Sequence, residues 1–359
     1  MKRSFGIDLI RTLSILVVIF RHYRVTDGYN FGIYAIEFLF VISGYLIGQI
    51  LLTEFHEAGT PNMKVVGRFM ARRWFRILPM YYFALLLKFI IVHDIGWNIL
   101  YYVFFLQNHF YGIDFYPVTW TLVIDEWFYL GTPFLLYGFV KMFGWDKKKL
   151  LLMLVGVIVL INLGRMFWVW KTNAGYESLV GNVPFRQDTL LIGVLGAFIK
   201  INYKSIFDWF NRRGPFWISM IGFLAFVVLI GYIQRDDVTN MNQYFWTRTI
   251  AFSFVALLIT MTMPYLENKV HGFSSPKMNW LNFIISYGSK LSYALYLYHL
   301  EVLGACRYLW PELDKQLWIR NSLCFTVSLV ISVLLYNFLE KQFLILREKY
   351  YPSLKPNTT

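Results

Sequence analysis

The sequence is short of charge and of cysteine. Only 15% of its 359 residues are charged, whereas soluble domains carry about 25%. The two cysteines, Cys306 and Cys324, stand in apolar segments without the spacing of metal ligands. These shortages argue against a soluble domain, and they predict neither a disulfide framework nor a zinc site. We expect no metal cofactor.

Apolar residues make up 57% of the chain. A bilayer core of about 30 Å is crossed by about 20 helical residues, and runs of this kind recur without an internal repeat or a soluble insert. The sequence therefore predicts an all-α transmembrane helix bundle of about ten spans in one membrane domain, residues 1–345, followed by a cytoplasmic tail, 346–359. The expected spans are 5–22, 33–53, 77–93, 118–142, 149–169, 187–200, 215–233, 247–265, 290–308 and 319–343.

The formal net charge is +13, but the basic residues lie mostly in short connections between apolar runs. This is the distribution that the positive-inside rule produces, so we expect no nucleic-acid partner. Region 94–118 has no lysine or arginine. Its apolar segment, 96–107, would cover only about 18 Å as a helix, so we expect it to be re-entrant or interfacial. Ten spans then place the basic clusters and both termini on the cytoplasmic side.

The first apolar run follows Lys2 and Arg3, as in a signal peptide. It contains Asp8, Arg11 and His22, however, and no small-residue cleavage site follows it. We therefore expect an uncleaved first helix.

Ionisable residues within this first helix point to function. Arg11 and His22 are eleven positions apart, which places them on one helix face, separated by about 16 Å. Asp8 is one turn before Arg11 and can pair with it. Charges at bilayer depth are costly and should face a cavity or a partner, and histidine exchanges protons near neutral pH. A structural Asp8–Arg11 pair, with His22 at the membrane interface, is the alternative interpretation.

Two adjacent carboxylates, Asp125 and Glu126, interrupt the apolar span 118–142. Neighbouring helical residues point about 100° apart, and Glu126 shares its face with Tyr129. We expect Glu126, rather than Asp125, to be buried and functional. The alternative is a structural carboxylate paired with an intramembrane arginine.

Two further stripes are polar. Ser292, Tyr296 and His299 share one face of span 290–308, where they would line a pocket or hold helices together by hydrogen bonds. Basic residues recur through segment 64–76 and end at Pro79. They would attract anionic lipid or, since arginine predominates, bind phosphate. The basic stripe consists of Lys64, Arg68, Arg72, Arg73 and Arg76.

Six motifs occur in order along almost the whole chain. Together they resemble the integral-membrane acyltransferase-3 family, the O-acyltransferases of bacterial surface polysaccharides. Asp125 and Trp127 replace the family's first Glu and its Gln, which leaves the roles on that helix less defined. The motifs are GIDLIRTLSILVVIFRH with Arg11 and His22, EFLFVISGYLIG with Ser43 and Gly44, RRWFRILP with Arg73 and Arg76, WTLVIDEWFYL with Glu126, GSKLSYALYLYH, and YNFLEKQF.

The resemblance implies a membrane O-acyltransferase. It would move an acyl group, most often acetyl, from acyl-coenzyme A to a hydroxyl of a cell-surface polysaccharide or its lipid-linked precursor, such as O-antigen. His22 would be the general base or carry a covalent acyl group. Asp8 or Glu126 would orient the imidazole, and Arg11 would stabilise the oxyanion or position the donor. The expected donor site is Arg72, Arg73, Arg76 and Ser43; the expected substrate pocket is Trp120, Tyr129, Ser292, Tyr296 and His299.

The expected location is the bacterial cytoplasmic (inner) membrane, with acyl-coenzyme A, a glycan or glycolipid acceptor and membrane lipid as partners. Some family members continue into an extracytoplasmic hydrolase-like domain, and we expect this chain to act without one. A transporter or flippase that uses intramembrane Asp, Arg and His as a pathway is the alternative, although the chain lacks the repeated halves of many transporters. A structural scaffold would leave the buried charges unexplained.

Overall fold

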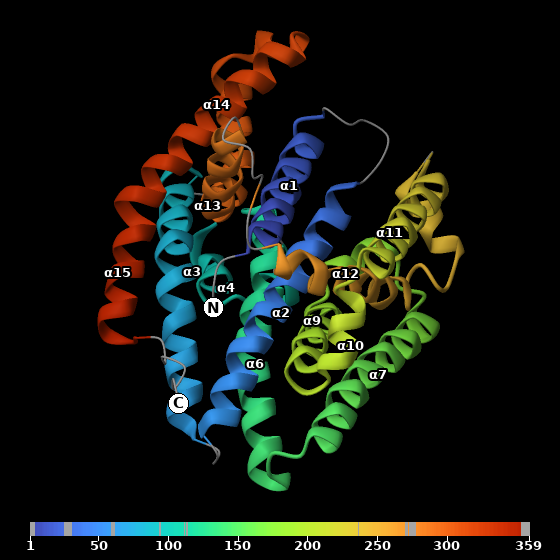
Figure 1. Ribbon diagram of the computed structural model, residues 1–359. Helices are drawn as coiled ribbons and strands as arrows, with labels where there is room; N and C mark the ends of the chain where they lie inside the picture. Colours follow the sequence, from blue (N-terminus) through green and yellow to red (C-terminus); the bar gives the residue numbers. More distant parts are fainter. Residues whose placement is uncertain are drawn as a thin grey trace. The chain divides into compact units, whose positions relative to one another are not determined.

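The computed structural model describes residues 4–24, 31–58, 62–92, 95–110, 112, 114–235, 237–269, 272 and 278–352. Within these residues every regular element is a helix (Figure 1), which confirms the all-α prediction. The longer helices are α1 (Phe5–His22), α2 (Phe31–Ala58), α3 (Met63–Val92), α6 (Trp120–Phe143), α7 (Lys147–Thr172), α9 (Val183–Asn202), α11 (Arg213–Gln234), α12 (Ala251–Asn268), α13 (Asn279–Leu309), α14 (Leu317–Leu335) and α15 (Lys341–Tyr350). The short ones are η1 (Gly96–Asn98), α4 (Ile99–Val103), α5 (Gln107–Phe110), η2 (Pro117–Thr119), α8 (Tyr176–Val180), α10 (Lys204–Phe210), η3 (Val238–Gln243), η5 (Pro311–Lys315) and the π-helical turn η6 (Tyr336–Glu340).

Five described helices are long and apolar enough to cross a membrane, and a sixth span results if α9 and α10, which meet at a bend of 115°, are counted as one. The predicted number of ten is therefore not confirmed. The expected spans that are not counted include those in α1, α6 and α13, where charged residues interrupt the apolar runs. The five spans are Gly32–Glu57, Met63–Val92, Lys147–Thr172, Arg213–Gln234 and Leu317–Tyr350.

Helix α3 differs from the prediction. The basic segment was expected to end at Pro79, but it continues through that proline into the apolar half, so both form one helix of 30 residues. Membrane helices tolerate an internal proline because neighbouring groups satisfy the backbone atoms that it frees. By contrast, segment 96–107 forms only short helices, as expected for a piece of chain that does not cross the membrane.

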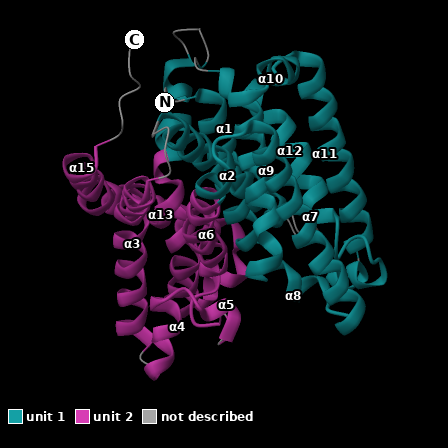
Figure 2. Cartoon of the chain, turned by 90° about the horizontal axis from the view of Figure 1, so that it is seen from below, with its two compact units in different colours: residues 1–59, 139–289 teal, residues 60–138, 290–359 magenta. Residues whose placement is uncertain are grey.

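The chain divides into two compact units, shown in Figure 2. Unit 1 comprises residues 1–59 and 139–289, and unit 2 comprises residues 60–138 and 290–359. Within unit 1, 78% of the apolar stretch of α2 is buried, compared with 17% of that of α7. Helix α2 therefore lies inside unit 1, whereas α7 exposes its apolar side chains as a helix that faces lipid does.

Glycines let α2 and α9 approach closely inside unit 1. A side chain at Gly44 would collide with the backbone carbonyl of Leu190, and one at Gly48 would meet the Cα atom of Val194. Small residues four positions apart are a common device for close packing of membrane helices. The Ser43–Gly44 motif is thus partly a packing motif.

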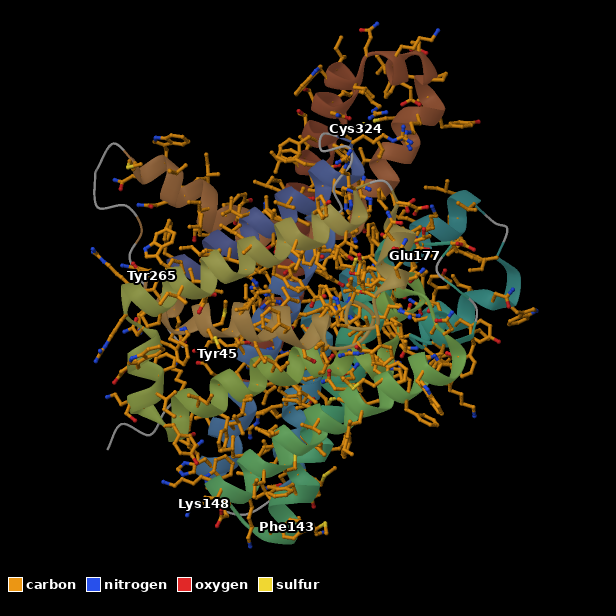
Figure 3. The ribbon with its side chains drawn as sticks, turned by 90° about the vertical axis from the view of Figure 1, so that its right-hand side faces the viewer. Tyr45, Phe143, Lys148, Glu177, Tyr265 and Cys324 are labelled. Carbon is orange, nitrogen blue, oxygen red and sulfur yellow. The ribbon has the colours of Figure 1, made fainter. Side chains whose placement is uncertain are left out.

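A polar cap begins α7, next to the basic cluster that contains Lys148 (Figure 3). The Asp146 carboxylate accepts hydrogen bonds from the backbone N–H groups of Lys148 (2.8 Å) and Lys149 (3.0 Å). Chiefly the bond from Lys149 holds the pKa of Asp146 below its usual value. A carboxylate at this position satisfies otherwise unbonded amides of the first turn.

Candidate active site

The predicted site residues fall into two groups, one in each unit. Unit 1 holds Asp8, Arg11, His22 and Ser43, and unit 2 holds the remaining candidates. Each group is built on long helices, which can hold side chains in fixed positions.

Helix α1 is anchored to the first part of α13 by two hydrogen bonds in unit 1. Thr12 donates to the backbone carbonyl of Ile285 (2.9 Å), and Ser289 donates to the buried carboxylate of Asp8 (2.7 Å). Buried Asp8 is therefore at least in part a structural anchor of this helix. Its predicted ion pair with Arg11 stays a prediction.

The geometry of α1 limits the roles of its ionisable residues. His22 is the last residue of the helix and is exposed, while Arg11 is half-buried. Asp8 and His22 are fourteen residues apart, or about 21 Å along the axis, which no aspartate side chain can bridge. The expectation that Asp8 orients the imidazole is therefore wrong. Arg11 lies about 16 Å from His22 along the axis, and its role toward the oxyanion or the donor stays a prediction.

Glu126 is buried, as predicted, with 7% of its surface exposed, whereas Asp125 is half-buried. The indole of Trp74 lies beside the Glu126 carboxylate and also lines the cavity that this carboxylate faces. The Oε1 atom of Glu126 has no hydrogen-bond partner among the described residues. A buried carboxylate oxygen without a donor is costly, so Glu126 is poised to accept a hydrogen bond.

Glu126 lines a cavity of about 300 Å³ within unit 2. Helices α3 and α6 and the end of α4 form its walls, and among the described residues Glu126 is the only charged one that lines it. Such a mainly apolar pocket with one polar group is typical of small-molecule sites. The other lining residues are Met70, Trp74, Leu78, Tyr82, Val103, Phe104, Phe105, Trp127 and Leu130.

Arg73 lies beside this cavity. Its guanidinium carbon is 5.6 Å from the ring centroids of both Phe69 and Tyr129, and its charge acts on Glu126. Arg76 and Arg347 lie close enough for their charges to act on Arg73. The carboxylate of Asp125 acts on Arg73 with the opposite charge. Arg73, Arg76 and Arg347 thus form a basic cluster, which suits an anion.

Arg72 differs from its two neighbours. It forms an ion pair of 2.9 Å with Glu348 of α15 and also bonds to the backbone carbonyl of Tyr351. These contacts tie α3 to the end of the chain in unit 2. Arg72 is thus engaged in structure, and its predicted part in donor binding stays a prediction.

The weaker candidates in unit 2 mostly join helices. Tyr296 donates to the backbone carbonyl of Val118 (2.8 Å) and accepts from Thr121 (2.7 Å), which links α13 to the start of α6. His299 is fully buried, and its Nδ1 lies 2.8 Å from the backbone carbonyl of Tyr296. These contacts favour the helix-joining role. The two remaining candidates of this group, Trp120 and Ser292, are half-buried.

Sequence reasoning missed a buried network in unit 1. Arg165 pairs with Asp188 at 2.9 Å, Arg186 pairs with Glu37, and both guanidinium groups lie over the ring of Phe252, at 5.1 and 4.3 Å. All four charged side chains are at most 2% exposed. Arg165, Arg186 and Asp188 interrupt apolar runs, which was a readable signal, but their partners cannot be deduced from sequence.

The two carboxylates of α6 give a direct mutational test. Glu126→Gln should lose most activity, roughly ten- to a hundredfold, because a charged hydrogen bond is worth about 1.5–3 kcal/mol. Asp125→Asn should stay within about twofold, as is usual for substitutions away from critical contacts. Initial rates of both variants at equal membrane content check this, and the reverse order would mean that the other face of α6 is functional.

Comparison with known proteins identifies the family of this chain. The model of a family described as an acyltransferase domain matches residues 4–337. The chain is 27% identical over 363 residues to a Staphylococcus aureus (strain MSSA476) protein named "Putative O-acetyltransferase", covering 96% of this chain and 58% of that protein. It is 26% identical over 373 residues to the "Peptidoglycan O-acetyltransferase OatA" of Listeria monocytogenes serovar 1/2a, covering 93% of this chain and 55% of that protein.

The "O-acetyltransferase OatA" of Staphylococcus aureus (strain NCTC 8325 / PS 47) is 25% identical over 320 residues, covering 83% of this chain and 50% of that protein. The chain thus spans little more than half the length of the curated relatives that it matches. No solved structure matches it.

Proposed function

The chain belongs to the acyltransferase family that its resemblance indicated, and from this we propose that it transfers an acyl group, most often acetyl, from acyl-coenzyme A to a glycan hydroxyl. The acceptor is a cell-surface polysaccharide or its lipid-linked precursor; O-antigen is one candidate, and the name of the Listeria relative adds peptidoglycan. The observation that carries the proposal is the buried Glu126 carboxylate in an apolar cavity, with Arg73 close enough for its charge to act on that carboxylate.

In this proposal His22 is the general base. It takes the proton of the acceptor hydroxyl as the hydroxyl oxygen attacks the thioester carbonyl, and the coenzyme leaves as a thiolate that is then protonated. In the covalent variant, an imidazole nitrogen attacks first and passes the acyl group to the hydroxyl afterwards. Arg11 stabilises the oxyanion or positions the donor.

The donor's phosphates are assigned to Arg73 and Arg76; the part of Ser43, which lies in unit 1, stays a prediction. Arginine suits phosphate because its planar fork forms paired hydrogen bonds. Arg72 is less suited, since Glu348 already occupies its guanidinium.

Arg76→Ala should weaken donor binding by about 1.5–3 kcal/mol, seen as a higher KM for acetyl-coenzyme A, with activity partly restored at high donor concentration. Arg72→Ala is the matched control from the same helix turn, and it should change KM little. Steady-state kinetics in detergent or nanodiscs measure both. Equal KM increases for the two variants would remove the distinction between them.

A transporter would use the buried ion pairs of unit 1 as its pathway, and one assay separates the two functions. Purified protein is incubated with acetyl-coenzyme A and a candidate glycan. The acyltransferase releases free thiol and yields an acetylated glycan, whereas a transporter gives neither.

We also propose that the protein lies in the cytoplasmic membrane, with ten spans and both termini in the cytoplasm. The charge distribution supports this, because the region without lysine and arginine lies between the basic start of α3 and the basic start of α7. Basic connections stay in the cytoplasm.

Cysteine labelling tests this topology. Asn108→Cys should react with an impermeant thiol reagent from outside the cell, while Lys148→Cys should react only after the membrane is opened. The parent for both carries Ser in place of Cys306 and Cys324, which are buried. Labelling of both positions from the same side would contradict the ten-span arrangement.

A further inference from the structure

The two cysteines of the chain meet in unit 2. Cys306 lies in the last turn of α13, and Cys324, labelled in Figure 3, lies near the start of α14. Their thiols are close enough to interact with each other. Both side chains are buried, with 3% and 0% of their surface exposed. Their spacing in the sequence predicted no disulfide framework, so the pair becomes visible only in the folded chain.

Charged residues lie beside this pair, at the turn between the two helices. Asp314 of η5 pairs with Arg320 at 2.6 Å and with Arg307 at 3.6 Å. Both arginines are near enough for their charges to act on Cys324. Nearby positive charge favours the thiolate, which is the reactive form of cysteine, whereas burial disfavours it. The pair should therefore react, but slowly.

We infer that Cys306 and Cys324 are a redox modification site, at which a small peroxide converts the two thiols into a reversible disulfide. The oxidant has to be small, because the side chains are at most 3% exposed and a protein oxidant could not contact their sulfur atoms. Hydrogen peroxide is uncharged and little larger than water, so it can reach the pair from either side of a membrane.

The reaction takes two steps. One cysteine, as its thiolate, attacks a peroxide oxygen; the O–O bond breaks, hydroxide leaves and takes up the thiol proton as water, and a sulfenic acid remains. The second thiol then attacks the oxidised sulfur, the S–S bond forms, and a second water leaves. Two electrons thus pass from the two sulfur atoms to the peroxide. A dithiol reductant reverses the change by thiol–disulfide exchange.

The bond would tie α13 to α14 across the turn that contains η5. Cys306 lies seven residues after His299, so the two share one face of α13. Tyr296, on the same helix, donates to the backbone carbonyl of Val118. Oxidation would therefore fasten α14 to the helix that holds the start of α6. Because a disulfide restricts the unfolded chain, it should stabilise the oxidised protein.

The test oxidises purified wild-type protein in nanodiscs with excess hydrogen peroxide, followed by denaturation and alkylation. Both cysteines should resist alkylation, and the peptides that contain them should be joined with the loss of two hydrogen atoms. A dithiol reductant should restore both thiols. These readouts concern the thiols alone, so they do not depend on the proposed acyl transfer.

Two variants serve as controls. Cys324→Ser with Thr326→Cys keeps two thiols in the chain but moves one to an exposed position about 200° around α14, so it should form no internal disulfide. Cys306→Ser with Cys324→Ser shows what peroxide does elsewhere in the protein. Oxidation should raise the unfolding temperature of the wild-type protein by several degrees and should not raise that of this variant.

Three results would overturn the inference. The wild-type cysteines could remain open to alkylation after prolonged oxidation, or each could gain oxygen without becoming joined. The displaced pair of Cys324→Ser with Thr326→Cys could join as readily as the native pair, which would mean that the folded positions do not direct the bond. A disulfide found only between two chains would likewise exclude a site within unit 2.

Discussion

Replacing His22 by alanine should lower kcat by about 10²- to 10⁴-fold, the usual contribution of a positioned acid or base. The affinity for acetyl-coenzyme A should change little, because the lost interaction is made in the transition state. His22 ends α1 and is exposed, so the substitution should not disturb folding.

The matched control is His56→Ala. His56 is another exposed histidine near the end of a helix, and its ring contacts Trp145. It has no place in the proposed chemistry, so activity should be retained. An active His22→Ala protein would refute the general-base assignment, and loss of donor binding on that change would move the coenzyme site to α1.

The second large effect concerns stability. Arg186→Met should cost about 3–5 kcal/mol of unfolding free energy, because it leaves Glu37 buried without its partner. The double variant Arg186→Met with Glu37→Leu should recover much of this loss, since an apolar pair can replace a buried ion pair. Unfolding in mixed detergent micelles measures the stability of the wild-type protein, the single variant and the double variant.

A surface pair serves as the comparison. Glu348→Gln removes the ion pair with Arg72, in which Glu348 is nearly half exposed. Pairs of this kind contribute about 0–1 kcal/mol. If the double variant at Glu37 and Arg186 were no more stable than the single one, the network would not act as an isolated pair, and its links to Phe252 and Asp188 would carry the stability.

The positions of several helices could be predicted from the local sequence. The first helix was expected at residues 5–22 and occurs there, and the burial of Glu126 followed from its place on one face of α6. Both features depend on local sequence. The number of spans could not be settled in the same way, because charged residues inside an apolar run, such as Asp8 in α1, lower its hydropathy whether or not the helix crosses the membrane.

Features that depend on partners far apart in the sequence could not be predicted. No pattern around Glu37 indicates that Arg186 is its counter-ion, and the bond between Asp8 and Ser289 joins residues 281 positions apart. The continuity of α3 through Pro79 was also missed, because proline ends helices in water but is tolerated in membranes. The division into two units rests on contacts of this distant kind.

The role of Arg11 illustrates how a helix restricts a mechanism. Spacing on one face suggested that it acts together with His22, and the unbroken helix keeps the two about 16 Å apart. Only extended side chains that point toward each other could meet at one reacting group. Otherwise Arg11 and His22 contact different parts of the substrates, as a long donor molecule would allow.

The most direct test of acyl transfer uses acetyl-coenzyme A that carries a deuterated acetyl group. Purified protein in nanodiscs is incubated with it and with a surface glycan fragment, and the glycan is analysed by mass spectrometry, with the His22→Ala protein in parallel. The proposed function predicts a glycan heavier by one deuterated acetyl group, equal in amount to the thiol released, and no such product from His22→Ala. An unlabelled glycan, with no thiol released by the wild-type protein, would contradict it.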